Sequence, residues 1–260
     1  MVVRWKKCKM EEILIKELEI LEKELSKKDF EIVLECVNNY ILSRNGAELR
    51  RKCDKKYCPV CSTRLKIQEY KKILEKIKGY DEILFLTLNG RNLAENYEKE
   101  LKKIKSQFNK IIKLKELDKI TLGYVRVVEI KGDNGIFKPH IHTILVVKNS
   151  YKKIWSRQKT GIKAIRKKIE KKWGEYNGNG EKNLTDLRAV GKTKKDKENL
   201  VRYLTGNLEK QMFNMNESEI RAYLKTVKGT NRVYSYGGVM RNKKRLKKSP
   251  KTLKVQDVVR

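Results

Sequence analysis

Hydrophobic and polar positions follow two periods along this chain, and these periods predict where helices and strands lie. Apolar residues recur every three to four positions, as in amphipathic helices, over residues 10–27, 65–78, 93–111, 161–174 and 197–208. Uninterrupted apolar and β-branched runs predict strands at 83–88, 122–130, 139–147 and 185–190. Between the first two helices we expect only a short apolar piece, Tyr40–Leu42, and a turn at Asn45-Gly46.

The order of these elements favours an α+β fold. The turn-forming segment Lys131–Gly135 predicts an antiparallel hairpin between the strands on either side of it. Together with the helices predicted before and after the strands, this hairpin favours a central antiparallel sheet with flanking helices. The sequence has no internal repeat and no low-complexity linker.

Positive charge dominates the composition. Lys and Arg number 64 against 32 for Asp and Glu, which gives a formal net charge of +32. Such a field attracts polyphosphates and speeds encounter with nucleic acid. A general lysine bias would raise Glu as well, so the imbalance favours nucleic acid as the partner. A membrane surface is the minor alternative, and it fits less well because the charge is spread over the whole chain.

Nothing in the sequence indicates membrane insertion or secretion. No stretch approaches the ~20 apolar residues of a membrane span, and Met1–Lys7 leads into charged, helix-patterned sequence rather than into the apolar core of a signal peptide. We therefore expect a cytoplasmic protein with no membrane partner. In that compartment the 5 cysteines are expected to be reduced thiols or metal ligands.

Four of the cysteines are spaced as in a structural zinc site. Cys53, Cys58 and Cys61 form a compact set that contains Cys-Pro-Val-Cys, and Cys36 lies 17 residues before Cys53. The tight Cys-Pro-x-Cys turn can direct two sulfurs at one ion, and four thiolates form a closed tetrahedral Zn²⁺ site that folds a small module. The alternative is a group of buried or redox-active thiols. Cys8 is the least suitable ligand.

The two histidines of the chain lie two residues apart on a predicted strand. His140 and His142 begin the run that continues to Val147. Side chains alternate between the faces of a strand, so both imidazoles project to the same side and are spaced to hold one divalent ion. Neutral imidazole suits a transition or zinc-like metal at neutral pH. The alternative is a pair of satisfied polar residues on a half-exposed strand.

Glu129 and Tyr203 are further candidates for this site. The hairpin can place Glu129 opposite the histidines as a third metal ligand, but it can also be an edge-strand carboxylate that pairs with Arg126. Phosphodiester chemistry requires a nucleophile as well, and a tyrosine can form a covalent phosphotyrosine. The chain has 12 tyrosines, and the residues alone favour Tyr203 as an aromatic on the buried face of its helix.

The order of several segments resembles that of the HUH endonucleases. These segments are Leu84–Leu88 followed by Asn92, then Gly123–Glu129, Pro139–Leu145 and a helix with Arg202 and Tyr203. More narrowly, the chain resembles the replication initiator (Rep) proteins of small rolling-circle plasmids. The segments that carry this similarity are Tyr151 to Trp155, Trp173, Asp186–Val190, Tyr234–Gly238, and the upstream cysteine with Cys-Pro-x-Cys. The resemblance covers about residues 36–240.

This resemblance implies a ferredoxin-like or RRM-like HUH sheet and a metal-dependent nickase and strand transferase. The DNA substrate is expected to be single-stranded or extruded origin DNA, and host helicase and polymerase are the expected partners. His140, His142 and Glu129 would hold Mn²⁺ or Mg²⁺, and Tyr203 would be the nucleophile that remains on the 5′ phosphate. The residues expected to contact DNA are Arg126, Arg188, Arg202 and, in the tail, Lys243, Lys244 and Arg245.

At the position of the acid that activates water in the family, this chain departs from the family pattern. Relatives often carry it four residues before the tyrosine, where this chain has Asn199, and the family's lysine three residues after the tyrosine is Gly206. Glu198 is the acid at hand, five residues before Tyr203. Around a helix axis, position 198 is about 140° from position 203, whereas position 199 is about 40° away.

We expect three regions along the chain. Residues 1–80 form a helical region with the zinc module at about 36–61, residues 81–230 form the endonuclease domain, and residues 231–260 form a basic tail. Two other functions remain open: a single-strand transposase or relaxase of the same HUH class, and a zinc-dependent DNA-binding regulator whose histidine pair is vestigial. Manganese-dependent cleavage of a single-stranded oligonucleotide distinguishes the enzymes from the regulator.

Overall fold

The computed structural model describes residues 18–44, 52–55, 57–90, 97–133, 136–158, 160–177, 185–206, 224 and 234–241. These residues fall into two compact units, one with the residues up to Ser62 and Arg241, and one that spans Thr63–Met240. None of the helices in these ranges combines the length and apolar character that crossing a membrane requires.

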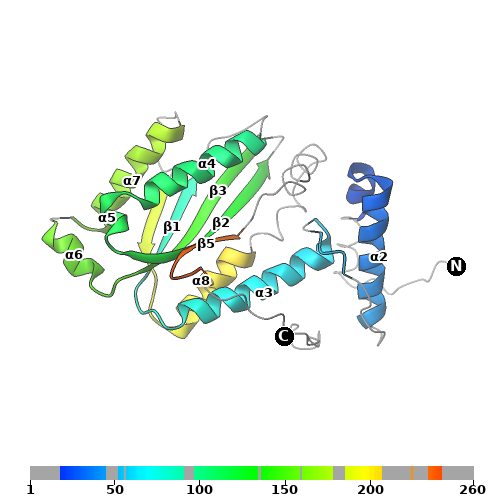
Figure 1. Ribbon diagram of the computed structural model, residues 1–260, viewed down its shortest axis with the longest axis horizontal. Coiled ribbons are helices and arrows are strands. Elements are labelled where there is room, and N and C mark those ends of the chain that lie inside the picture. Colours follow the sequence, from blue (N-terminus) through cyan, green and yellow to red (C-terminus); the bar gives the residue numbers. More distant parts are fainter. Residues whose placement is uncertain are drawn as a thin grey trace. The chain divides into compact units, whose positions relative to one another are not determined.

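A five-stranded antiparallel sheet is the core of the second unit (Figure 1), which confirms the predicted α+β class. Its order is β4-β1-β3-β2-β5. The strands are β1 (Ile83–Asn89), β2 (Thr121–Asp133), β3 (Ile136–Val147), β4 (Thr185–Ala189) and β5 (Tyr234–Gly238). The first four lie within a few residues of the predicted strands, because buried strands show as unbroken apolar runs. The strand β3 with the histidines is central and is paired on both sides.

Helices cover both faces of this sheet, and each face has its own apolar core. One face packs against α4 (Tyr97–Ile112), α5 (Lys115–Asp118), α6 (Tyr151–Arg157) and α7 (Ile162–Asn177). The other face packs against α3 (Pro59–Ile77) and α8 (Lys194–Gly206). Figure 1 shows α4 and α7 on one side of the strands and α8 on the other. The histidines lie on the face that α3 and α8 cover.

Two elements correct the sequence analysis. The segment predicted as a short apolar piece and a turn lies partly in α2 (Lys27–Arg44), which includes Cys36 and Tyr40–Leu42. The prediction missed this helix because its apolar residues, such as Phe30, Ile32 and Val33, are spread around the helix axis, which weakens the helical period. Residues 18–24 of the predicted first helix are helical as well, and the earlier part of it lies outside the described residues.

The second correction concerns β5, which the sequence analysis assigned to the basic tail after residue 230. The strand pairs with β2, and two glycines permit this close approach. A Cβ atom on Gly237 would lie 2.1 Å from the Tyr124 ring, and Gly238 has a φ of +55° and lies directly against the backbone of Leu122. Glycine tolerates both conditions because it has no Cβ. The sheet therefore extends beyond the predicted boundary of the domain.

A capping box sets the start of α8, the helix that carries Tyr203. The Thr193 hydroxyl accepts a hydrogen bond from the Asp196 backbone N–H at 3.1 Å, and the Asp196 carboxylate accepts one from the Thr193 N–H at 3.2 Å. Each residue thus accepts a hydrogen bond from the backbone N–H of the other, and both N–H groups at the start of the helix have a partner. Leu200, Val201 and Leu204 then bury one face of the helix against the sheet, which fixes where Tyr203 emerges.

Candidate active site

Cross-strand register gathers the candidate residues on one face of the sheet. His140 on β3 lies between Asn89 on β1 and Glu129 on β2, and the next residue on the same face, His142, lies between Thr87 and Val127. Directly opposed residues share a face. The predicted hairpin therefore places Glu129 beside the histidine pair.

The ring of His140 is held with one nitrogen turned to Asn89. Its Nδ1 lies 2.7 Å from Asn89 Oδ1, and since an amide oxygen only accepts, the Nδ1–H of His140 is the donor. The other nitrogen, Nε2, is buried and carries the lone pair in this tautomer. Trp173 fixes the same strand end, because its Nε1 donates to the Asn89 carbonyl oxygen at 2.7 Å. A histidine oriented in this way by a hydrogen bond presents its other nitrogen as a possible metal ligand.

His142 and Glu129 form a buried hydrogen-bonded pair. His142 Nε2 lies 2.7 Å from Glu129 Oε2, and the side chains are 4% and 3% exposed. His142 Nε2 donates to the carboxylate, while Nδ1 accepts from the Thr87 hydroxyl at 3.2 Å. A metal on His142 Nε2 would therefore replace this proton, with the Glu129 carboxylate already next to it.

The histidines and Glu129 supply suitable donors, but they are less closely gathered than the cysteines. Among the described residues, only the four cysteines form a group of three or more possible ligands whose donor atoms all lie within 4.8 Å of one another. The rings of His140 and His142 are stacked in nearly parallel planes, with centroids 6.2 Å apart. Two imidazoles and a carboxylate on one face match a divalent transition metal chemically.

Tyr203 reaches this face of the sheet from α8. Its ring centroid is 5.5 Å from that of His142 and 5.7 Å from that of Phe85, edge-on in both cases. The residue remains 43% exposed, and within the described part of the chain its hydroxyl forms no hydrogen bond. Sequence reasoning from the residues alone favoured a buried aromatic. The structure instead places a half-exposed phenol beside the histidine pair.

Phe85 and Thr87 are site residues that the sequence analysis missed. The Phe85 ring stacks on His142 with centroids 5.9 Å apart and also contacts Tyr203. Both residues lie in a run read as a buried strand, and Phe85 is 1% exposed, so their pattern is that of core. Alternation along β1, combined with its pairing to the histidine strand, is the signal that identifies them.

The structure separates Glu198 from Tyr203 as the helix geometry predicts. Glu198 is half-buried and its carboxylate lies 3.8 Å from Lys194 Nζ on the preceding turn. Tyr203 and Asn199 lie on one flank of α8 and Glu198 on the other.

The candidate DNA contacts lie in different environments. Arg126 is 8% exposed on the face away from the histidines, where it bonds the Lys105 carbonyl oxygen and the Ser235 hydroxyl and lies over the Phe108 ring. Burial lowers the pKa of its guanidinium. These contacts make Arg126 part of the core, which argues against a role in DNA contact. Arg188 and Arg202 are exposed, and the tail cations Lys243, Lys244 and Arg245 lie outside the described residues, as does Asn92.

The predicted cysteine set comes together in the first unit. Cys36 lies on α2, Cys53 on the segment before α3, and Cys58 and Cys61 at the start of α3. The Sγ atom of Cys61 is 3.6 Å from those of Cys36 and Cys53. A tetrahedral Zn²⁺ with bonds of about 2.3 Å separates its sulfurs by about 3.8 Å. The observed spacing therefore matches a four-thiolate metal site.

Hydrogen bonds and burial shift the pKa values of thiols within this set. Bonds from Cys58, and then from Cys53 and Cys36, lower the pKa of the Cys61 thiol to about 5, whereas burial raises the pKa of Cys53 to about 12. Metal coordination requires thiolates, so a bound divalent cation would displace the thiol protons. Residue Asp54, next to Cys53, adopts a φ of +50°, which turns the chain within the set.

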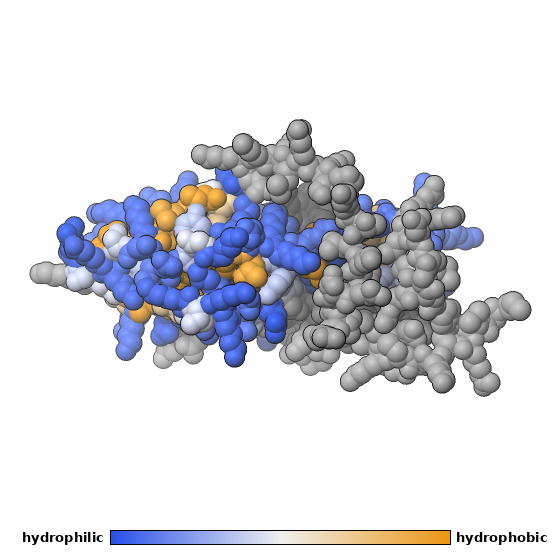
Figure 2. All heavy atoms as spheres, turned by 90° about the horizontal axis from the view of Figure 1, so that it is seen from below, coloured by the Kyte–Doolittle hydropathy of each residue, from blue (hydrophilic) through white to orange (hydrophobic). Residues whose placement is uncertain are grey.

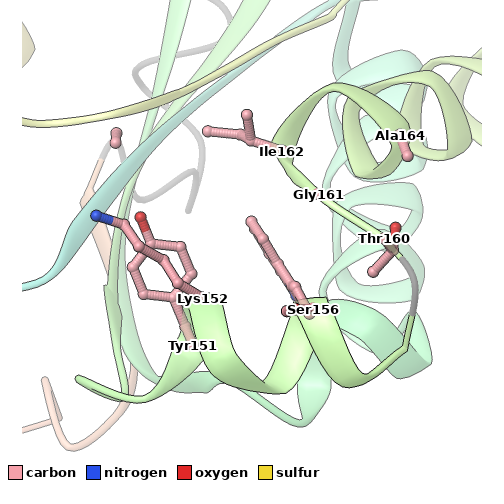
Figure 3. A pocket seen from close by; sticks show the side chains of 9 residues that line it. Tyr151, Lys152, Ser156, Thr160, Gly161, Ile162 and Ala164 are labelled. Atoms are coloured by element: carbon pink, nitrogen blue, oxygen red, sulfur yellow. The ribbon is translucent and has the colours of Figure 1, made fainter.

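A separate cavity of about 560 Å³ lies between α6 and α7. Figure 3 shows Tyr151, Lys152 and Ser156 on α6 across from Ile162 and Ala164 at the start of α7. None of the histidine-site residues lines it. Tyr151, Trp155 and Trp173, which carry part of the sequence resemblance, are buried in the core on this side.

The fold and the site thus define an α+β protein with a histidine pair, a carboxylate and a tyrosine on one face of an antiparallel sheet. A family model described as Replication protein matches residues 47–260. The chain therefore belongs to this family of replication (Rep) proteins, and the resemblance stated from the sequence motifs is confirmed.

Individual relatives are also Rep proteins. The chain is 30% identical over 134 residues to "Protein rep" of Staphylococcus aureus, an alignment that covers 48% of this chain and 58% of the relative. It is 33% identical over 109 residues to "Protein rep" of Lactiplantibacillus plantarum, and here the alignment covers 38% of this chain and 34% of the relative. The matches therefore span between a third and three-fifths of these relatives. No solved structure matches the chain.

Proposed function

We propose that this protein initiates rolling-circle DNA replication by nicking one strand of origin DNA through Tyr203 and later rejoining it. The observation that carries this proposal is the position of the Tyr203 ring, half-exposed and 5.5 Å from the His142 ring, on a helix opposite the histidine strand. The proposed nucleophile and the proposed metal ligands thus lie on one face of the sheet. Membership of the Rep family supports the same function.

In the proposed reaction the Tyr203 oxygen attacks the scissile phosphorus. The bond from phosphorus to the 3′ oxygen of the preceding nucleotide breaks, which leaves a 5′-phosphotyrosine and a free 3′ hydroxyl. The phenolic proton passes to solvent, and the leaving oxygen takes up a proton. Rejoining is the reverse step with a 3′ hydroxyl as nucleophile, and the rigid packing of Tyr203 against Phe85 keeps the phosphorus close to the same groups.

His140, His142 and Glu129 are the residues proposed to hold the divalent ion. The donor set of two imidazoles and one carboxylate favours Mn²⁺ over Mg²⁺, which prefers oxygen ligands. When bound, this ion supplies Lewis acid polarisation of the phosphate. Asn89 and Thr87 orient the two imidazole rings through their hydrogen bonds.

DNA is proposed to follow the basic surface around Tyr203. Arg202 precedes the tyrosine on α8, and Arg188 lies over the Phe85 ring that Tyr203 also contacts. Figure 2 shows hydrophilic residues over most of the coloured surface of one face, with small separate hydrophobic patches. A surface of this kind suits phosphate contacts more than a large apolar interface. Single-stranded or extruded origin DNA is the proposed substrate, and host helicase and polymerase are the proposed partners.

The four cysteines are proposed to bind a structural Zn²⁺. Their sulfur spacing and burial support this assignment. Because α2 and α3 contribute ligands on either side of the intervening segment, the ion would fix these elements of the first unit.

The experiment that tests the proposed function is mass spectrometry of the protein after incubation with a single-stranded origin oligonucleotide and Mn²⁺. We expect a covalent adduct on Tyr203 in the native protein and no adduct in Tyr203→Phe, which removes one oxygen and keeps the ring contacts. Binding of the uncleaved oligonucleotide should stay within about twofold. An adduct that persists in Tyr203→Phe would refute the assignment, and a protein that binds but never cleaves would favour the regulator.

A further inference from the structure

Asp186 shares the face and the row of the histidine site. It lies on the edge strand β4 opposite Thr87, which in turn lies opposite His142 on β3. Since neighbouring strands are about 4.8 Å apart, Asp186 lies two strands, or about 10 Å, from His142 along this row. Its side chain is 48% exposed, so it is open to water and substrate.

Arg188 connects Asp186 to the neighbourhood of the tyrosine. Its guanidinium carbon is 5.2 Å from the centroid of the Phe85 ring, and its Nε lies 3.9 Å from Asp186 Oδ2. The ring of Tyr203 contacts the same Phe85. The Phe85 ring is therefore a shared neighbour of Tyr203 and of Arg188, the partner of Asp186.

The other carboxylates near this row are otherwise engaged. Glu129 is buried and bonded to His142. Glu198 lies on the opposite flank of α8 from Tyr203 and beside Lys194. Among the strand carboxylates whose side chains the structure describes, Asp186 is the exposed one on the histidine face.

We propose that Asp186 is the general base that activates water for hydrolysis of the Tyr203–DNA adduct, a role for which the sequence alone offered Glu198. This inference rests on the proposed function. Water attacks the phosphorus, its proton passes to the Asp186 carboxylate, and the bond from phosphorus to the Tyr203 oxygen breaks. The products are a 5′-phosphate and the Tyr203 phenolate, which takes up a proton from solvent. Arg188 is placed to orient the Asp186 carboxylate.

The test measures hydrolysis of the adduct separately from the nicking reaction that forms it. The full-length native protein, Asp186→Asn and Glu198→Gln are each loaded with the origin oligonucleotide, the adduct is isolated, and its loss in Mn²⁺ buffer without any 3′ hydroxyl acceptor is followed on a denaturing gel. A general base contributes about 10²–10⁴-fold. We therefore expect the rate of adduct hydrolysis in Asp186→Asn to fall at least about 100-fold more than the rate of adduct formation. In Glu198→Gln the rate of hydrolysis should fall far less.

Three outcomes would overturn the assignment. The first is hydrolysis at the native rate in Asp186→Asn, and the second is its selective loss in Glu198→Gln. The third is equal slowing of adduct formation and hydrolysis in Asp186→Asn, which indicates a structural or DNA-binding role. Failure of the proposed function itself is distinguishable, because then the native protein forms no Tyr203 adduct from which hydrolysis could be measured.

Discussion

Replacement of Phe85 by leucine should impair the site far more than it impairs the fold. Phe85 is 1% exposed and contacts the rings of His142 and Tyr203 and the guanidinium of Arg188. Leucine keeps an apolar side chain in the core but cannot support these flat contacts. We therefore expect the rings of Tyr203 and His142 to lose the flat aromatic surface that holds both of them in position.

Phe108 provides a matched control on the other face of the sheet. It is fully buried, contacts the Tyr124 ring at 5.3 Å and lies 4.8 Å from the Arg126 guanidinium carbon. An aromatic pair contributes about 0.5–1.5 kcal/mol and a cation–π contact about 0.5–1 kcal/mol or more. Phe85→Leu and Phe108→Leu should each lower the free energy of unfolding by about 1–3 kcal/mol.

The two variants should differ in chemistry. A displacement of the reacting groups by about 1 Å can slow a reaction about 100-fold, which corresponds to about 2.7 kcal/mol of activation free energy. The assay is the single-turnover rate of adduct formation with saturating Mn²⁺, beside urea unfolding of each variant. Equal rates in Phe85→Leu and Phe108→Leu at equal stability would refute the idea that Phe85 positions the site.

Three further results are expected. Cys61→Ser should lose one equivalent of zinc by elemental analysis, whereas His142→Ala should keep it; loss of zinc in both would contradict two separate metal sites. Glu129→Gln should raise the Mn²⁺ concentration for half-maximal adduct formation about tenfold or more, and an unchanged Mn²⁺ dependence would remove Glu129 from the ligand set. Gly238→Ala, at a φ of +55°, should destabilise the fold by at least about 1–2 kcal/mol in urea unfolding, while Gly79→Ala, whose added Cβ meets nothing within 4 Å, should not; equal stability of the two variants would contradict the strained geometry.

The sequence allowed the sheet to be predicted where burial leaves an unambiguous pattern. The central strands β1 and β3 are buried along most of their length and show as apolar runs. The edge strand β5 has only five residues, two of them glycines, and its place depends on pairing with β2, more than a hundred positions earlier. Such a contact leaves no local period. The helix α2 was missed for a related reason, because its polar and apolar residues are mixed.

The placement of the candidate site residues could be predicted where the backbone fixes geometry and could not where tertiary packing does. The i, i+2 spacing placed both histidines on one face, and the hairpin placed Glu129 opposite His140. The same alternation places Arg126, three residues before Glu129, on the opposite face of the strand. What the sequence does not reveal is that Phe108 and Ser235 pack around its guanidinium there, because both are distant along the chain.

The packing of the helix that carries Tyr203 determines whether this residue is buried in the core or exposed as a possible nucleophile. Leu200, Val201 and Leu204 are buried, and Tyr203 lies at the margin of that face, where its ring contacts Phe85 and His142 while 43% of the residue remains exposed. These contacts direct the phenol toward β1 and β3, on the other flank of the helix from Glu198. A family that places its acid on the tyrosine helix uses i, i+4 geometry. In this chain Asn199 holds that position, and Asp186 on the sheet edge is the carboxylate that we propose in its place.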